Sequence, residues 1–409
     1  MSSNAISQPI DKQQWVRDHI LLGMQPRDYV KSLLTPVDII IGLILAIGIP
    51  TIVYRFWAGL GAVTNLSQTT PWGLWISLDV ASGVALAAGG YTVACTVYIF
   101  GLKKFSPIVR PAVLTGMLGY LLVVLGLLVD LGMPWHLPYP LFLHFGTTSV
   151  MFELAWCVAL YFGVLVFEFL PAVLEWLGLR KMRLYLAKFA IGAIIAGVML
   201  STLHQSSLGS LFLLVPDKLH PLWYSPFLPF FFFLSSIAAG IGMVIFESSV
   251  SHKAFHDQLK KDKPVDIDGI TLGLAKGGAL VLFAYFFLKI QGVVANGSWH
   301  LLNTRMGAWF LVEMLGFILL PSLLFAVAAH FSRPVLARVA AVLTVLGILL
   351  NRFNVSWLAL NWDAPIRYTP SVYEIITSLT IITIGVAAFR WIVNRMPVLV
   401  EHPDYKGIH

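Results

Sequence analysis

Long apolar stretches recur along the whole chain and are separated by short polar segments. A helix needs about 20 apolar residues to cross a bilayer, and ten stretches are long enough. They lie near residues 36–57, 72–100, 110–131, 147–170, 186–205, 225–248, 270–292, 306–330, 336–355 and 372–394. A transmembrane barrel would instead show alternating runs of about ten residues. The pattern therefore predicts an all-α polytopic membrane protein with ten transmembrane helices.

The composition excludes a water-soluble globule. Of 409 residues, 58% are hydrophobic and 11% are charged, against about 25% charged in soluble domains. The mean hydropathy is +0.82. The net charge of +7 does not indicate nucleic acid binding, because the lysines and arginines lie mostly between the spans. Their distribution reports membrane topology instead.

The basic residues divide unevenly between the two sides of the predicted membrane. With spans alternating in direction, 20 lysines and arginines fall on one side, five on the other, and two, Lys276 and Lys289, within the seventh span. The five are Arg55, Lys218, Arg305, Arg352 and Arg367. Because cytoplasmic loops carry the basic excess, both termini are expected in the cytoplasm.

The predicted spans and their orientation divide the chain into three segments: a cytoplasmic N-terminal segment at 1–34, a ten-helix transmembrane domain at 35–395 and a cytoplasmic tail at 396–409. The first segment is polar and lacks an apolar signal core, so the first span is expected to act as an uncleaved signal. The outer loops, at 58–71, 132–146, 206–224, 293–305 and 356–371, are rich in Pro, Trp, Tyr and His. An aromatic belt at the membrane surface explains such residues singly. As a set, they suit a docking surface for a periplasmic partner.

Ionisable side chains fall inside the predicted spans, where a charge costs about 2.5–3.5 kcal/mol on insertion scales. At about 1.5 Å per residue, Asp79 and Glu153 are expected about 10 Å below the outer surface. Tyr120 is expected near mid-membrane, His204 at the outer end of the fifth span and Glu247 at the inner end of the sixth. Such residues are functional candidates by default.

Other acidic residues are open to a plainer explanation. Asp38, Asp130 and Glu168 lie close to an interface and are equally explained as solvated helix ends, as is Glu247. Glu313 is expected in the outer third of the eighth span. Most titratable groups thus gather in the outer half of the membrane.

This set suits a quinone, whose two carbonyl oxygens accept hydrogen bonds and whose reduction takes up two protons with two electrons. His204 can donate to one carbonyl and pass a proton near neutral pH, with Gln205 as a further polar group beside it. Asp79 is expected to carry protons at the headgroup, with Trp72 in the pocket wall.

Haem is the competing redox group. A membrane haem usually needs two facing histidines at similar depth, and His144, His204 and His330 offer no such pair. The two cysteines, Cys95 and Cys157, are too few for an iron–sulfur cluster. The sequence therefore predicts no haem, cluster or metal on this chain, and places any redox centres in a partner.

Several stretches carry a family resemblance. They are "PWGLWISLD" followed by Gly89 and Gly90, "SPIVRPAVLTGMLGY", "DLGMPWHLPYPLFLHFGTTSVMFE", "LHQSSLGSL", "KLHPLW" and "IFESS", within about residues 69–250. Beyond residue 270 the similarity rests on "NRFN" and "YTPSVYEI". With these motifs the chain resembles the NrfD/PsrC family of integral membrane quinone subunits. It is most similar to the branch found in periplasmic nickel–iron hydrogenases and related menaquinone reductase complexes.

The resemblance implies a membrane subunit in the bacterial inner membrane that is not active alone. A periplasmic ferredoxin-like iron–sulfur subunit, with further catalytic subunits such as a hydrogenase, molybdoenzyme or multihaem cytochrome c, would deliver electrons to menaquinone near the outer face. It assigns functional roles to Asp79, Tyr120, Glu153, His204 and Glu247, and nothing comparable to Glu313 or Glu374. It also implies two four-helix bundles plus a peripheral helix at each end.

Two other functions stay open from the sequence. Buried carboxylates and ten helices also suit a proton-coupled secondary transporter, although the chain shows no convincing inverted repeat. A passive anchor for a periplasmic enzyme is the third possibility, and it leaves the buried carboxylates without a purpose.

Overall fold

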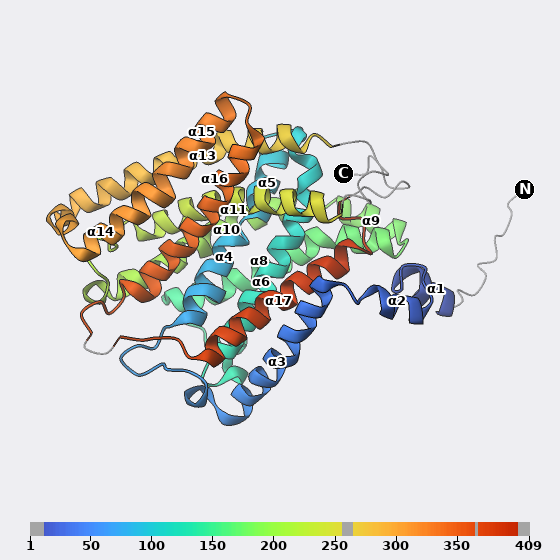
Figure 1. Ribbon diagram of the computed structural model, residues 1–409, viewed down its shortest axis with the longest axis horizontal. Coiled ribbons are helices and arrows are strands. Elements are labelled where there is room, and N and C mark those ends of the chain that lie inside the picture. The colour runs from blue at the N-terminus through green and yellow to red at the C-terminus, as the bar shows by residue number, and fades with distance from the viewer. Residues whose placement is uncertain (1–11, 256–264, 365–366, 400–409) are drawn as a thin grey trace, which may run out of the picture.

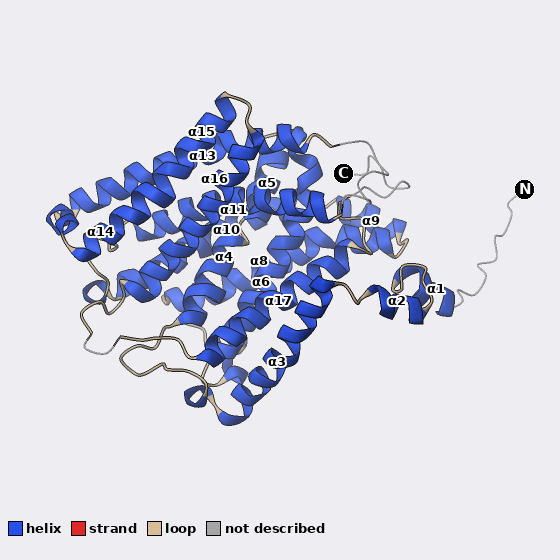
Figure 2. Cartoon of the chain, in the orientation of Figure 1, coloured by secondary structure: helices blue, strands red, loops and turns tan. Residues whose placement is uncertain are grey.

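The computed structural model describes residues 12–255, 265–364 and 367–399. Within these ranges every long element is a helix, and the β-structure consists of one isolated bridge between Leu219 and Leu360 (Figure 2). Residues 1–11 of the predicted N-terminal segment and 400–409 of the predicted tail lie outside the described residues.

Ten helical stretches of the described chain are long and apolar enough to span a membrane, as predicted. Five spans are single helices: α3 (Pro36–Ala58), α8 (Val150–Trp176), α11 (Leu228–Ala254), α13 (Ile267–Ala295) and α17 (Val372–Val393). The second span is composite, with η2 (Trp75–Ser82), α4 (Gly83–Leu86), α5 (Gly89–Ala94) and η3 (Cys95–Ile99). The other four are η4 (Lys103–Ile108) with α6 (Val109–Asp130), α10 (Ala190–Ser210) with η6 (Leu211–Leu214), α14 (Arg305–Leu311) with η9 (Val312–Leu319) and α15 (Leu320–His330), and α16 (Pro334–Phe353) with η10 (Asn354–Leu358).

Several predicted span ends are wrong by up to nine residues. The fifth span continues to Leu214, so His204 lies well inside the helix instead of at its outer end. The sixth continues to Ala254, which likewise places Glu247 inside it. The fourth begins only at Val150, so Glu153 stands in the first turn, and its side chain is exposed.

Arg352, counted above with the basic residues of the outer side, lies farther inside the ninth span than predicted. It lies in the last turn of α16 and is fully buried. The reason is that the span continues beyond it to Leu358, through a π-helical turn whose apolar residues follow the charge.

Each span from the second to the eighth packs on the next one along the chain, and the helices lie side by side in Figure 1. The second span contacts α6, which contacts α8, and α8 contacts α10; α11, α13, α15 and α16 contact one another, and α10 joins the two sets by packing on α11. α17 packs on α6 and η2, and α3 packs on α17. Of the 18 most apolar consecutive residues of α3, only 6% are buried. The outermost position of α3 agrees with a peripheral first helix, and the grouping into two bundles stays an interpretation.

Two segments distant in sequence, one at residues 65–69 and one that includes Asn361 and Thr369, meet at one end of the spans, which we call the loop face. Asn361 donates to the carbonyl of Thr69 at 3.1 Å, and Asn65 donates to that of Thr369 at 3.0 Å. At the other end, the terminal face, Arg395 donates to the hydroxyl of Tyr29 at 2.6 Å. Both described chain ends therefore lie on the terminal face, which the excess of basic residues predicts to be cytoplasmic.

Small residues let the second span approach α11 closely. A Cβ added at Gly240 would stand 2.9 Å from backbone atoms of Ala88 and Gly89. Backbone cannot rotate away as a side chain can, so overpacking here is expected to destabilise the fold by about 1–3 kcal/mol. We expect Gly240→Ala to lower the midpoint of thermal unfolding in detergent, whereas Gly163→Ala, where nothing lies within 4 Å, leaves it unchanged. Equal midpoints for the two variants would contradict this packing.

Candidate functional site

His204 and Tyr120 form a hydrogen-bonded pair in the protein interior. They come from α10 and α6, both side chains are fully buried, and the Tyr120 hydroxyl is bonded to His204 Nε2. His204 Nδ1 lies 2.8 Å from the carbonyl of Leu200, which can only accept, so Nδ1 carries the hydrogen. In the neutral ring, Nε2 is therefore the acceptor and Tyr120 the donor. The helix backbone thus fixes the tautomer of His204.

Tyr161 completes a three-ring cluster with this pair. Its ring centroid lies 4.8 Å from that of Tyr120 and 5.4 Å from that of His204. Ser201, one turn before His204 on α10, lies beside both tyrosine hydroxyls. Gln205 donates to the carbonyl of Val84 at 2.9 Å and so joins α10 to the second span. The cluster is a set of hydroxyl and imidazole groups within the membrane-spanning region.

Glu153 joins this cluster to the loop face. Ser207 donates to a Glu153 carboxyl oxygen at 2.7 Å. Ser207 follows His204 by one turn of α10, so both are on one face of the helix. Glu153 is thus an exposed carboxyl one helical turn from the buried histidine.

Asp79 is placed elsewhere. It is 6% exposed, and it accepts a hydrogen bond of 2.6 Å from Ser378 on α17. A Cβ added at Gly126 of α6 would lie 2.7 Å from Asp79 Cβ, so α6 passes directly against it. Asp79 and His204 thus have different partners, on different sides of α6 and the second span.

Three π-helical turns carry buried polar residues. Asp79 is in η2, Glu313 in η9 and Asn354 in η10. Such turns are rare and occur frequently at functional sites. The sequence gives no signal for them, because their hydropathy matches that of an ordinary helix.

Glu247 lies on the terminal-face side of the cluster. It is 9% exposed on α11, and the Thr115 side chain of α6 lies beside its carboxyl. Thr115 precedes Tyr120 by about 7.5 Å along the same helix.

Trp72 lines a cavity of about 270 Å³ on the loop face. Trp357, Trp362 and Tyr368 form aromatic walls, and Ser356 lies at the same cavity. This volume approaches the lower end of small-molecule sites, about 300 Å³. Trp72 also packs edge-on against Phe212, just beyond α10, at 5.6 Å.

Tyr368 ties this cavity to α17. Its hydroxyl donates to Glu374 and accepts from the backbone nitrogen of Leu74 at 3.1 Å. Burial, and then the neighbouring Glu374 carboxylate, raise the pKa of Tyr368 above its ordinary value, so it stays a hydrogen-bond donor. Glu374 also forms a capping box with Ser371 at the start of α17. Glu374 thus ties together two segments of the loop face, at Asn65 and at Tyr368.

Sequence reasoning missed a buried ionic network in the other half of the molecule. Lys289 and Glu313 form an ion pair of 2.6 Å. The same carboxyl also accepts from Asn351 at 2.7 Å, Trp223 at 2.8 Å and Asn354 at 2.5 Å. All five side chains are nearly or fully buried. The only sequence signal was the presence of Lys289 and Glu313 within spans.

Arg352 adds a second cation to this network. It donates to Asn351 at 2.8 Å and Ser235 at 2.9 Å, and its guanidinium lies 3.8 Å from the ring centroid of Phe232. These partners are uncharged. The network of Lys289, Glu313 and Arg352 therefore carries a net positive charge.

Comparison with known proteins agrees with this architecture. Residues 62–360 match the family described as Polysulphide reductase, NrfD. A protein of Nitratidesulfovibrio vulgaris (strain Hildenborough) is 51% identical over 388 residues, covering 94% of this chain and all of the relative. The probable Ni/Fe-hydrogenase 2 b-type cytochrome subunit of Escherichia coli K12 is 32% identical over 364 residues, covering 88% and 91%. The integral membrane subunit of menaquinone reductase from Nitratidesulfovibrio vulgaris is 27% identical over 380 residues, covering 86% and 88%. The chain therefore belongs to the NrfD family, a membrane subunit similar to those of reductase and hydrogenase complexes.

Proposed function

We propose that this chain is the quinone-binding membrane subunit of a respiratory oxidoreductase complex. Electrons would come from a periplasmic iron–sulfur subunit and reduce menaquinone. The observation that carries the proposal is the buried Tyr120–His204 pair, joined through Ser207 to Glu153. The name of one relative, a menaquinone reductase membrane subunit, supports the substrate class.

The substrate headgroup fits the cavity on the loop face. Trp72, Trp357 and Tyr368 offer flat apolar surfaces to a naphthoquinone ring, and Arg367 and Asn361 at the cavity offer donors to its carbonyl oxygens. When bound, the quinone accepts two electrons and two protons.

The buried polar residues would then move protons. His204, with Tyr120 as its hydrogen-bond donor, would take up and release a proton, and Gln205 would hold α10 in place. Glu153 would connect this pair to the loop face, and Glu247 would be a second carboxyl on the terminal-face side. Because His204 and Gln205 have no exposed surface, we assign neither to direct headgroup contact: His204 would transfer protons and Gln205 would position α10.

Asp79 is a separate proton carrier in this proposal. Asp79 lies four residues after Trp75, where η2 begins. In the same π-helical segment, Ser77 accepts a hydrogen bond of 2.8 Å from the cavity residue Ser356. The bond of Asp79 to Ser378 places Asp79 against α17. The two groups, Asp79 and His204, would serve the same reaction from different sides.

The b-type cytochrome in one relative's name raises the question of haem. His204 is the histidine deepest in the candidate site, and both its ring nitrogens are already bonded, to Tyr120 and Leu200. The residues present therefore do not fit an axial haem ligand there. We expect no haem absorbance from this chain in the optical spectrum of the purified complex; a haem spectrum abolished by His204→Ala would contradict this expectation.

The loop face is the surface we propose for the iron–sulfur partner. Its aromatic loops adjoin the cavity, so a cluster docked there would be near the headgroup. The bacterial inner membrane, with this face toward the periplasm, is the location that the basic-residue distribution supports.

Gentle solubilisation of the native complex tests the proposal. Co-purification of an iron–sulfur protein with this chain, shown by chain identification and iron analysis, is the expected result. Recovery of this chain alone, with substrate uptake in liposomes, would instead favour a proton-coupled transporter. Recovery with an enzyme whose electron transfer to quinone does not need this chain would favour a passive anchor.

A further inference from the structure

We propose that Glu168, with the cavity it lines on the terminal face, is the proton-uptake group that supplies the Tyr120–His204 pair. The inference rests on the proposed quinone function and deepens it. It replaces Glu247 as the first carboxyl of the route from the terminal face.

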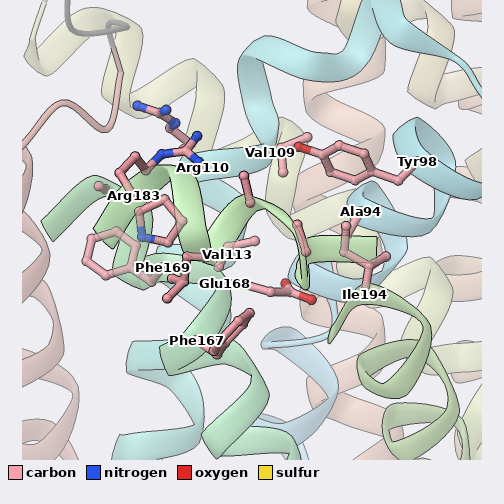
Figure 3. Close-up of a pocket in the computed structure, with 15 residues that line it drawn as sticks. Ala94, Tyr98, Val109, Arg110, Val113, Phe167, Glu168, Phe169, Arg183 and Ile194 are labelled. Carbon is pink, nitrogen blue, oxygen red and sulfur yellow. The ribbon is translucent and has the colours of Figure 1, made fainter. Parts of the chain in front are cut away.

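The cavity gives Glu168 access to the terminal face. It has a volume of about 110 Å³ and lies among the second span, α6, α8, α9 (Arg180–Ala187) and α10. Figure 3 shows Arg110 and Arg183 at the upper left of the cavity, Tyr98 at the upper right, and the Glu168 carboxyl below them. The Glu168 side chain is partly exposed in it. A volume of this size holds several water molecules, each of which needs about 30 Å³.

Two carboxyl groups lie near the arginines of this cavity, those of Glu175 and Glu168, and the arginines pair with Glu175. Arg110 forms a two-pronged pair with Glu175, at 2.8 and 2.9 Å, and Arg183 bonds the same carboxylate at 2.9 Å. Glu175 is fully occupied by these two cations, and it anchors them at the mouth. Glu168 faces Tyr161 along its own helix, and Tyr98 across the cavity.

Two helix faces join Glu168 to the histidine. On α10, Ile194, Gly197, Ser201 and His204 follow the three- and four-residue spacing of a single face. On α8, Glu153, Tyr161 and Glu168 lie along the facing side, since each contacts a residue of that α10 face or its next turn. Glu153 and Glu168 are about 22 Å apart along the helix axis. The line therefore covers most of a hydrocarbon core of about 30 Å.

The gap between Glu168 and Tyr161 on this line lies beside Gly197. A Cβ added at Gly197 would stand 3.3 Å from a Glu168 carboxyl oxygen and 3.5 Å from the Tyr161 ring. Glu168 and Tyr161 are therefore within about 7 Å of each other across the glycine. The atom of Tyr161 in this comparison is a ring carbon, so we propose that one or two waters link the Glu168 carboxyl to the Tyr161 hydroxyl. Beyond Tyr161 lie Ser201 and then the Tyr120–His204 pair. The Tyr161 hydroxyl and Ser201 Oγ are buried without a hydrogen-bond partner among the described residues, so both are free to bond a water on this line.

Glu247 lies off this line. It is on α11, and its carboxyl is beside Thr115 of α6. It reaches Tyr120 only along α6, whereas Glu168 faces Tyr161 directly and lines the cavity.

The test uses the intact complex in liposomes. Reduced methyl viologen supplies electrons to the partner subunits, a soluble naphthoquinone is the acceptor, and a pH dye reports protons lost from the compartment at the terminal face. Each quinone reduced to quinol consumes two electrons and two protons. We expect Glu168→Gln to lower both quinone reduction and proton loss by at least about tenfold, within the range of general acid–base effects. Glu168→Asp, which keeps the carboxyl, should restore most of both rates.

The control is Asp268→Asn, which also removes a carboxyl from the terminal-face end of a span. Asp268 pairs with Arg338 in an exposed position, and it lies on α13, away from α8 and α10. It should leave both rates unchanged. A Glu168→Gln complex with the rates of the wild type would overturn the Glu168 proposal. So would a wild-type complex that takes its protons from the loop-face side alone. Either result would leave the quinone function standing. A wild-type complex that does not reduce the naphthoquinone would overturn the proposed function itself.

Discussion

Replacing His204 with alanine is expected to lower quinone reduction by the assembled complex about 10²- to 10⁴-fold, the usual contribution of a positioned acid–base group. The substitution removes the imidazole that accepts from Tyr120 and leaves that hydroxyl buried without its partner. Steady-state reduction of a soluble naphthoquinone measures the loss. Binding of the partner subunits should persist, because His204 is buried within the spans.

A second variant separates chemistry from folding. Tyr120→Phe keeps the ring packing against Tyr161 and removes only the hydroxyl, so it should reproduce a substantial part of the loss. Leaving one buried partner unpaired costs about 1–3 kcal/mol of stability, which thermal unfolding of each variant reveals. Wild-type turnover in both variants would contradict the assignment of this pair to proton transfer.

The largest effect on stability is expected from Lys289→Met. Removing one member of a buried ion pair costs about 3–5 kcal/mol, because the other charge stays buried without compensation. Glu313 would keep three uncharged donors, from Trp223, Asn351 and Asn354, which soften the loss without replacing the cation. Thermal unfolding in detergent should show a strongly lowered midpoint.

An exposed ion pair is the matched control for this prediction. Arg338 and Asp268 are bonded at the surface, with side chains 33% and 58% exposed. Exposed pairs contribute about 0–1 kcal/mol, so Arg338→Met should change the midpoint little. A Lys289→Met protein as stable as this control would show that the buried network does not hold the second half of the fold together.

The number and approximate position of the spans could be predicted because each is a long apolar run of bilayer length. The end of the fifth span could not. Gln205, Ser206 and Ser207 lower the local hydropathy, which set the predicted end at residue 205. In the structure Ser206 donates to the carbonyl of Thr202 at 2.9 Å, and the Ser207 hydroxyl, which donates to Glu153, also lies 3.0 Å from the carbonyl of Leu203. Hydroxyls bonded to the preceding turn fit within a membrane helix.

The site was only partly predictable for a related reason. Depth along a span can be counted from the sequence, and it placed Asp79 and Tyr120 inside spans, although it put His204 too near the outer end. All three side chains are buried in the structure. The direction of a side chain around its helix cannot be counted, so the partners of Asp79 on α17 were not anticipated. The Lys289–Glu313 pair joins two different spans and needs their packing to be known.

The most direct measurement of the central claim compares the intact complex with its extrinsic subunits alone. Both preparations should oxidise the electron donor with an artificial dye, and only the intact complex should reduce a soluble naphthoquinone. That result would place quinone reduction on this chain. Equal naphthoquinone reduction by the extrinsic subunits without it would contradict the account.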